Sequence, residues 1–239
     1  MAGSIRQFVE DYRRLRLSEG LASSDPSFAR SLPFRDPSGR NTAIWRVRAF
    51  HYALLRGALA LMPRARRVLD LGAGNGWLAR RLALSHQVTA VDVDATDTGL
   101  RGLADVPVHR VRADLEALPF ADGHYDVVIV AAALHYATEL PRALAEIARV
   151  LRGGGAFILA DSPVYPDAPA RHQAWLRTLR YYSEAGTPDL ARRYRGLTRD
   201  ELEKSGLFRW LTISPGVSPL RALRRNGDAR FPVLLGWKR

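Results

Sequence analysis

The sequence predicts an α/β domain with a doubly wound, mostly parallel sheet and a helical extension before it. First, a short apolar run at residues 68–71 leads into a glycine-rich turn and then into a segment with helical spacing. Second, further short apolar runs end in acidic residues and are followed by helical segments. Third, the chain has 239 residues, of which 47% are hydrophobic, enough for one such domain with a sizeable core plus an appended segment.

The composition excludes several kinds of protein. Cysteine is absent, so disulfides, thiolate metal sites and cysteine nucleophiles are excluded. No run of about eighteen apolar residues occurs, and the N-terminal segment lacks an apolar signal core. We therefore expect a cytoplasmic protein without a membrane span.

The net charge is +12, and nearly all the basic residues are arginine. The arginines are scattered, with denser groups at residues 13–16, 64–67 and 221–225. Because charged runs usually face water, we expect these side chains to be solvated, and a polyanion site among them is the alternative.

Residues 1–62 are predicted to form a helical cap or lid, and residues 63–239 the main domain. Residues 4–21 carry apolar side chains at helical spacing, and helical periodicity resumes at residues 40–62. The stretch between them, residues 22–41, is rich in Ser, Pro, Asp and Gly and is expected to be a loop. These helices either shape a ligand site or only cover one face of the sheet.

The first core strand and the turn after it lie in residues 68–83, VLDLGAGNGWLARRLA. Gly72, Gly74 and Gly76 permit the backbone angles and the close ligand approach that such a turn requires, and the next helix points free N–H groups at a bound molecule. A dinucleotide-binding fingerprint needs a small residue where this chain has Trp77. A phosphate-binding P-loop needs a Gly-Lys-Ser/Thr sequence, which does not follow.

The remaining pattern, D-x-G-x-G-x-G starting at Asp70, resembles the first motif of the class I S-adenosylmethionine (SAM) dependent methyltransferases, and in particular the small-molecule and ubiquinone-biosynthesis type. The resemblance implies that the glycine turn passes under the methionine end of SAM. It also implies that N-terminal helices cover the cofactor and shape the substrate pocket. The cofactor-binding residues that it implies in this stretch are Asp70, Gly72, Ala73, Gly74, Gly76 and Trp77.

The second strand, QVTAVDVD, ends at Asp92, twenty residues after Gly72. An acid at that distance lies at the tip of the neighbouring strand, where its two oxygens can accept hydrogen bonds from both ribose hydroxyls. We therefore assign Asp92, with Val93 beside it, to the cofactor. Asp94 either begins the following helix or approaches the ribose edge.

The third strand, PVHRVRAD, ends at Asp114, and the segment after it reads LEALPFADGHYDVV. This is a second match to the methyltransferases, whose members often have an acid, a short apolar linker, L-P-F, a turn and then F/Y-D-x-V. The resemblance implies that Asp114 accepts a hydrogen bond from the adenine amino group and that Leu115 packs on the adenine ring. The alternative for Asp114 is a turn-forming or helix-capping role.

The fourth strand, YDVVIVAAA, is followed by a helix, a glycine turn at residues 153–155 and a fifth strand that ends at Asp161. The glycine segment is similar to the family pattern L-[KR]-P-G-G, with Gly153 in place of the proline. The resemblance thus covers about residues 67–161, through four motifs in the family's order.

The C-terminal part is predicted to contain an insertion at about residues 163–200 that contributes to the substrate pocket. It is helical at residues 168–182. The segment LTRDELEKSGLF indicates a capped helix that begins after Thr198 and stops at Gly206. WLTIS and FPVLLGWK are the last strands. The resemblance implies that they complete a seven-stranded Rossmann-like sheet whose final strand is antiparallel.

The carboxyl ends of the fourth and fifth strands face the methyl group in such a sheet. They carry His135, Tyr136 and Asp161, which we take as the candidate catalytic residues. His135 is either a general base, a donor that orients the substrate, or a packing residue. Tyr136 is a hydrogen-bond donor, an aromatic wall of the site or a residue of the packed core.

The motifs that the chain lacks reduce the number of possible substrate classes. AAALHY replaces the Asn/Asp-Pro-Pro-aromatic tetrad of enzymes that methylate the amino groups of nucleic-acid bases, and only Asp161 and Ser162 stand where a metal site would need several oxygens. We therefore favour metal-independent transfer from SAM to an O, N or C atom of a small organic molecule, with S-adenosylhomocysteine as product. An RNA methyltransferase and a non-catalytic SAM-binding protein are the alternatives. The pathway and the oligomeric state stay open.

Overall fold

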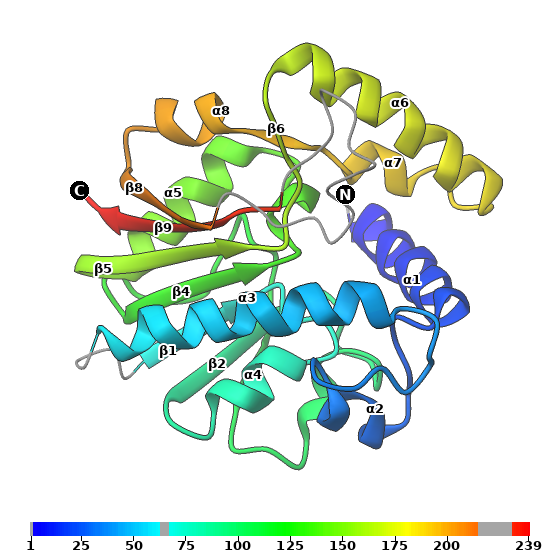
Figure 1. The fold of residues 1–239 in the computed structure, drawn as a ribbon, viewed down its shortest axis with the longest axis horizontal. Helices are drawn as coiled ribbons and strands as arrows, with labels where there is room; N and C mark the ends of the chain where they lie inside the picture. The colour runs from blue at the N-terminus through cyan, green and yellow to red at the C-terminus, as the bar shows by residue number, and fades with distance from the viewer. Residues whose placement is uncertain (1, 63–66, 215–230) are drawn as a thin grey trace.

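A computed structural model describes residues 2–62, 67–214 and 231–239. A seven-stranded sheet with the order β3-β2-β1-β4-β5-β9-β8 runs through the centre of the molecule (Figure 1). Strands β1 to β5 are parallel, and β9 is antiparallel to both of its neighbours, which confirms the predicted fold. The strands are β1 Arg67–Leu71, β2 Gln87–Asp92, β3 His109–Arg112, β4 Tyr125–Ala131, β5 Leu151–Ala160, β8 Phe208–Ser214 and β9 Val233–Lys238.

Both faces of the central strands are buried, as expected for a parallel sheet covered by helices on each side. Val68 and Ile129 pack with helices α3, Thr42–Ala60, and α4, Trp77–Leu82. Leu69 and Val128 point to the other face and pack with α5, Leu140–Val150. The period-2 alternation of strand side chains therefore divides the core into two layers.

The N-terminal segment contains three helices where the sequence predicts two. The additional helix α2, Pro26–Ser31, lies between α1, Ala2–Glu19, and α3. Asp25 caps it by accepting a hydrogen bond from the Ser27 N–H at 2.8 Å, and Pro26 occupies its first turn. The expectation of a loop was wrong here because the helix has only six residues, and half of them, one Pro and two Ser, are also typical of loops.

Two details around the sheet also differ from the predictions. The glycines at residues 153–155 lie inside β5, because Leu151 already pairs with Tyr125 and the register then shifts before Ala156 pairs with Val127. They form a bulge in the strand instead of a turn before it. Strand β3 ends at Arg112, so Asp114 lies two residues beyond it.

The segment after β5 builds a small layer above the carboxyl edge of the sheet (Figure 1). The two-residue strands β6, Val164–Tyr165, and β7, Leu197–Thr198, pair in parallel, and Thr198 is the predicted N-cap of helix α8, Arg199–Lys204. Helices α6, Ala168–Glu184, and α7, Leu190–Arg193, pack against α1 through a cluster that includes Leu15, Tyr182 and Leu190. Segments far apart in the sequence thus meet over one edge of the sheet.

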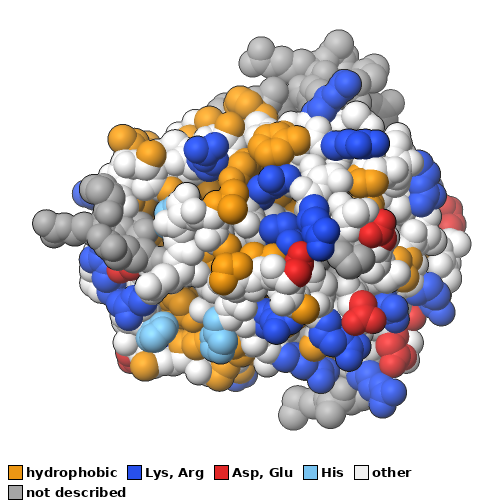
Figure 2. All heavy atoms as spheres, turned by 90° about the horizontal axis from the view of Figure 1, so that it is seen from below, with side chains coloured by type: hydrophobic (Ala, Val, Ile, Leu, Met, Phe, Trp, Pro, Cys, Tyr) orange, Lys and Arg blue, Asp and Glu red, His pale blue; other side chains and the backbone are white. Residues whose placement is uncertain are grey.

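The two remaining elements are short 3₁₀ helices, η1 Leu100–Leu103 and η2 Leu134–Tyr136. Among the described residues, no helix is long and apolar enough to cross a membrane. Lys and Arg side chains are spread over the face shown in Figure 2, with acidic and hydrophobic side chains among them.

Candidate functional site

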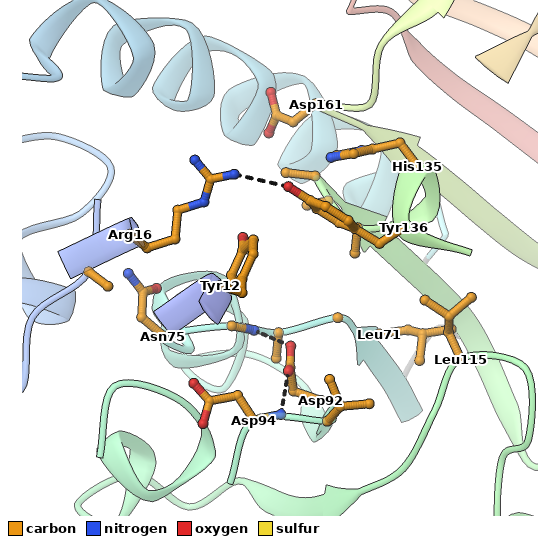
Figure 3. A pocket seen from close by; sticks show the side chains of 18 of the residues that line it. Tyr12, Arg16, Leu71, Asn75, Asp92, Asp94, Leu115, His135, Tyr136 and Asp161 are labelled. Carbon is orange, nitrogen blue, oxygen red and sulfur yellow. Dashed lines mark hydrogen bonds between the residues drawn. The ribbon is translucent and has the colours of Figure 1, made fainter. Parts of the chain in front are cut away.

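A cavity of about 470 Å³ lies at the carboxyl ends of the central strands (Figure 3). Loops after β1, β2, β3, β4 and β5 form its floor, and residues from α1, α3 and α7 complete its walls. The predicted site residues that line it are Gly72, Ala73, Gly74, Trp77, Asp92, Val93, Asp114, Leu115, His135, Tyr136 and Asp161.

The other two predicted site residues, Asp70 and Gly76, are not among the residues that line the cavity. Asp70 is 1% exposed, and its burial is the main reason why its pKa rises to about 7, partly offset by a hydrogen bond from the Ala79 backbone. Gly76 begins α4 with a φ of 74°, and a Cβ there would overlap Leu103. Both residues therefore belong to the buried structure on either side of the glycine loop and not to the cavity wall.

The glycine loop has the geometry of a ligand cradle. Gly72 has a φ of 76°, and a Cβ added to it would lie 2.2 Å from the Cβ of Ala133, so only glycine fits. Gly74 has a φ of 52°, and an added Cβ would meet no atom within 4 Å among the described residues. The space above Gly74 is therefore open to a ligand that approaches the backbone closely.

Asp92 is held at the tip of β2 by two backbone donors. Its Oδ2 accepts from the Gly74 N–H and its Oδ1 from the Asp94 N–H, both at 2.8 Å (Figure 3). Burial raises the pKa of Asp92 to about 6, against the opposing effect of these N–H groups. Each carboxylate oxygen keeps a second lone pair, so the side chain can still accept from two hydroxyls.

Asp94 and Asp114 both form turns while they line the cavity. Asp94 accepts a hydrogen bond from the Thr96 N–H at 2.8 Å, and the only regular element between β2 and β3 is η1, so Asp94 does not begin a full helix. Asp114 accepts from the Glu116 N–H at 3.0 Å. The turn-forming role considered for Asp114 and its place on the cavity wall are therefore compatible.

His135 and Tyr136 lie after β4, at the other end of the cavity from Asp92 and Asp94 (Figure 3). His135 is 6% exposed, and its Nδ1 is 3.3 Å from the Ser162 hydroxyl. Burial, with the charges of Arg16 and Arg48, lowers the pKa of His135 to about 3. The imidazole is thus neutral near pH 7, and its low basicity makes it a poor match for a general base.

Several residues that line the cavity near His135 and Tyr136 belong to no sequence motif and were not predicted. Arg16 of α1 donates a hydrogen bond to the Tyr136 hydroxyl at 2.9 Å and lies over the Tyr12 ring. Arg13, Arg48 and Arg193 also line the cavity. The expectation that the arginine groups are solvated is therefore wrong for part of the first group, since α1 turns Arg13 and Arg16 toward the cavity.

A buried histidine pairs with Asp161 from the N-terminal segment. His51 of α3 is 1% exposed, and its Nδ1 lies 2.6 Å from Oδ1 of Asp161. Asp161 has a φ of 55°, which is rare for a residue with a side chain and places its carboxylate between α3 and the cavity. No sequence spacing signals this pair, because its members are 110 residues apart.

The chain is similar to known proteins over the part that contains the glycine loop. Residues 69–159 match a family model described as a methyltransferase domain. A malonyl-[acyl-carrier protein] O-methyltransferase of Enterobacter lignolyticus is 37% identical over 127 residues, which are 50% of each chain. The mitochondrial arginine-hydroxylase NDUFAF5 of Mus musculus is 34% identical over 92 residues, 38% of this chain and 27% of that one. The chain therefore spans between about a quarter and a half of the length of these relatives.

A solved structure shows the same fold along the whole chain. The SAM-dependent methyltransferase of Thermotoga maritima superposes with a TM-score of 0.56 at 18% identity and covers 100% of both chains. At this identity the likeness concerns the fold, whereas the domain match covers residues 69–159, which include the glycine loop, Asp92 and Asp114. Residues 69–159 thus match a methyltransferase domain, and the chain as a whole has the fold of a SAM-dependent methyltransferase.

Proposed function

We propose that this protein transfers a methyl group from SAM to an O, N or C atom of a small organic molecule, without a metal ion, and releases S-adenosylhomocysteine. The observation that carries the proposal is the position of Asp92, whose carboxylate is fixed by the Gly74 and Asp94 backbone in the wall of a cavity. The same cavity continues to the polar side chains of His135 and Tyr136, where an acceptor can reach the cofactor.

The residues present fit SAM. Asp92 would hold the ribose hydroxyls, the open space above Gly74 would receive the methionine part, and Asp114 with Leu115 would contact the adenine. When bound, SAM supplies a methyl group on a sulfonium, which a nucleophile attacks in line. The protein's own contribution is to hold the acceptor in that line and to keep water away from it.

At the acceptor end we propose different roles for the three candidate catalytic residues. Neutral His135 and Tyr136 orient the acceptor by hydrogen bonds, because the low pKa of His135 does not suit proton removal. Asp161 receives the proton when the acceptor carries one. Its Oδ1 is fixed by His51, so the carboxylate has a set direction toward the cavity.

We propose that residues 1–62 act as a helical cap and that the insertion at 163–200 completes the substrate pocket in the domain formed by residues 63–239. Tyr12 and Arg16 from α1, with Arg193 from α7, line the cavity and support this division. Helix α3 has a second role, since Trp45 and Leu55 belong to the buried core below the sheet. A cytoplasmic location is part of the same proposal.

RNA is the less supported acceptor. Arg13, Arg16, Arg48 and Arg193 line the cavity, and on the face shown in Figure 2 the basic side chains are interspersed with acidic and hydrophobic ones. RNA binding should therefore be weak and should disappear near physiological ionic strength, since each phosphate contact releases a counterion.

The proposed reaction uses no metal ion. In the described residues, no three His, Asp or Glu side chains lie close enough together to form a metal site.

Release of S-adenosylhomocysteine against matched panels of small metabolites and RNAs tests the proposal. We expect release with a metabolite, and loss of that activity in Asp92→Asn but not in Asp97→Asn. Asp97 is a suitable control because its side chain is 69% exposed. Release with RNA alone would overturn the small-molecule proposal, and binding of SAM without release on either panel would favour a non-catalytic protein.

A further inference from the structure

The acceptor end of the cavity contains an arginine that has no acidic partner among the described residues. Arg48 of α3 is half-buried and lines the cavity, with its guanidinium 4.6 Å from the centre of the Trp45 ring. Its guanidinium makes no ion pair and donates no hydrogen bond to any residue that the structure describes. A guanidinium has five donors in a planar fork, so Arg48 is available to a ligand.

The surroundings of Arg48 add to its positive potential. Arg16 approaches the same region, and the charges of both arginines act on His135. Glu19 neutralises Arg16 in part, through an ion pair of 2.5 Å. Asp161 also lines the cavity, but its Oδ1 is already bound to His51 at 2.6 Å.

An anionic oxygen group is the natural complement of such a site. Guanidinium hydrogen bonds to carboxylate or phosphate are charge-assisted, which makes them about twice as strong as hydrogen bonds between neutral groups. They are also frequently bidentate, with two parallel N–H donors. The neutral imidazole of His135 can donate an additional N–H without adding a charge. The aromatic rings of Tyr136 and Tyr194 lie beside His135, with ring centres 4.4 and 5.1 Å away, and suit a flat acceptor.

We propose that the acceptor carries an oxyanion, a carboxylate or a phosphate, which Arg48 binds with Arg16 and His135 beside it. This inference rests on the proposed function, because it assigns the substrate class of the same cavity. The rival explanation is that Arg48 binds the methionine carboxylate of SAM. The two explanations differ in which ligand a loss of Arg48 weakens.

The test uses the full-length protein saturated with S-adenosylhomocysteine. Benzoate, phenyl phosphate and the neutral analogue benzamide are titrated by calorimetry into the wild type, Arg48→Gln and Arg48→Lys. Arg46→Gln is the matched control, because Arg46 is exposed on the same helix and does not line the cavity. Comparison of benzoate with phenyl phosphate identifies the kind of oxyanion.

We expect one of the two anions to bind at least about tenfold more tightly than benzamide, as one charge-assisted contact implies. The preference should fall to within about twofold in Arg48→Gln and should persist in Arg48→Lys and Arg46→Gln. Equal binding of anions and benzamide by the wild type would overturn the inference. So would an Arg48→Gln variant that weakens S-adenosylhomocysteine instead of the anion. Failure of the wild type to bind S-adenosylhomocysteine at all would instead refute the proposed function.

Discussion

Asp92 combines burial with two backbone hydrogen bonds, and this combination has a consequence for pH. Its pKa is raised to about 6, so the carboxyl is ionised at pH 7.5 and mostly protonated at pH 5. A protonated carboxyl offers fewer acceptor sites to the Gly74 and Asp94 N–H groups and to two ribose hydroxyls. Cofactor affinity should therefore be highest above pH 7.

The predicted result is a dissociation constant for S-adenosylhomocysteine that is flat above pH 7 and about tenfold weaker at pH 5, if the protonated form binds poorly. Asp92→Asn should bind weakly at every pH, with no such change between pH 5 and 7.5. Calorimetric titrations at four pH values measure both. An equally steep decline in Asp92→Asn would show that another group titrates, and a flat wild-type profile would contradict the role of Asp92.

His135 is predicted to orient the acceptor as a neutral side chain. With the substrate identified by the release assay, His135→Gln should keep its kcat within about threefold of the wild type, because an amide can still hydrogen-bond. His135→Ala should lose more, on the order of tenfold, because the hydrogen bond is lost. A hundredfold loss in His135→Gln, with a wild-type kcat that falls at acidic pH, would instead identify His135 as a base.

Among the elements, the turn between β1 and α4 depends most strongly on residue type. Gly72 lies below Ala133 of the β4 loop, which leaves no room for a Cβ, and its φ is positive as well. Gly39 has a similar φ of 68°, but an added Cβ would meet no described atom within 4 Å. Comparing alanine variants at the two positions therefore distinguishes the cost of backbone strain alone from the cost of strain together with steric overlap.

Gly39→Ala should lower the free energy of unfolding by about 1 kcal/mol and leave S-adenosylhomocysteine binding intact. Gly72→Ala should destabilise the protein by more than that and weaken binding at least about tenfold, since the loop must move to relieve the overlap. Urea unfolding and calorimetry measure the two effects. Wild-type affinity in Gly72→Ala would show that the loop does not form the cofactor cradle.

At the scale of the whole molecule, the features predicted from the sequence are those whose residues are close together in the chain. The glycine turn, Asp92 and the succession of the first five strands follow from patterns in residues 67–161, because each strand and the loop after it are adjacent in the chain. The side chains that other elements add to the cavity were not predicted. Arg16, Arg48 and His51 reach the site only through the packing of α1 and α3 on the sheet, for which no local pattern exists.

The same limit explains the errors in the elements. Helix α2 is short and half of its residues are also typical of loops, whereas the glycines of β5 show their strand register only once Leu151 is paired with Tyr125. Tertiary pairing decided only the second case. The ends of the long, periodic segments were predicted more closely, as in α6.

The proposed methyl transfer requires that the cavity at the carboxyl ends of the strands binds SAM. Calorimetric titration of SAM, S-adenosylhomocysteine, NADH and ATP into the full-length protein tests it. We expect one site for SAM and S-adenosylhomocysteine, no binding of NADH or ATP, and a loss of roughly 1.5–3 kcal/mol, more than tenfold in affinity, in Asp92→Asn. Binding of NADH or ATP in place of SAM, or unchanged affinity in Asp92→Asn, would contradict it.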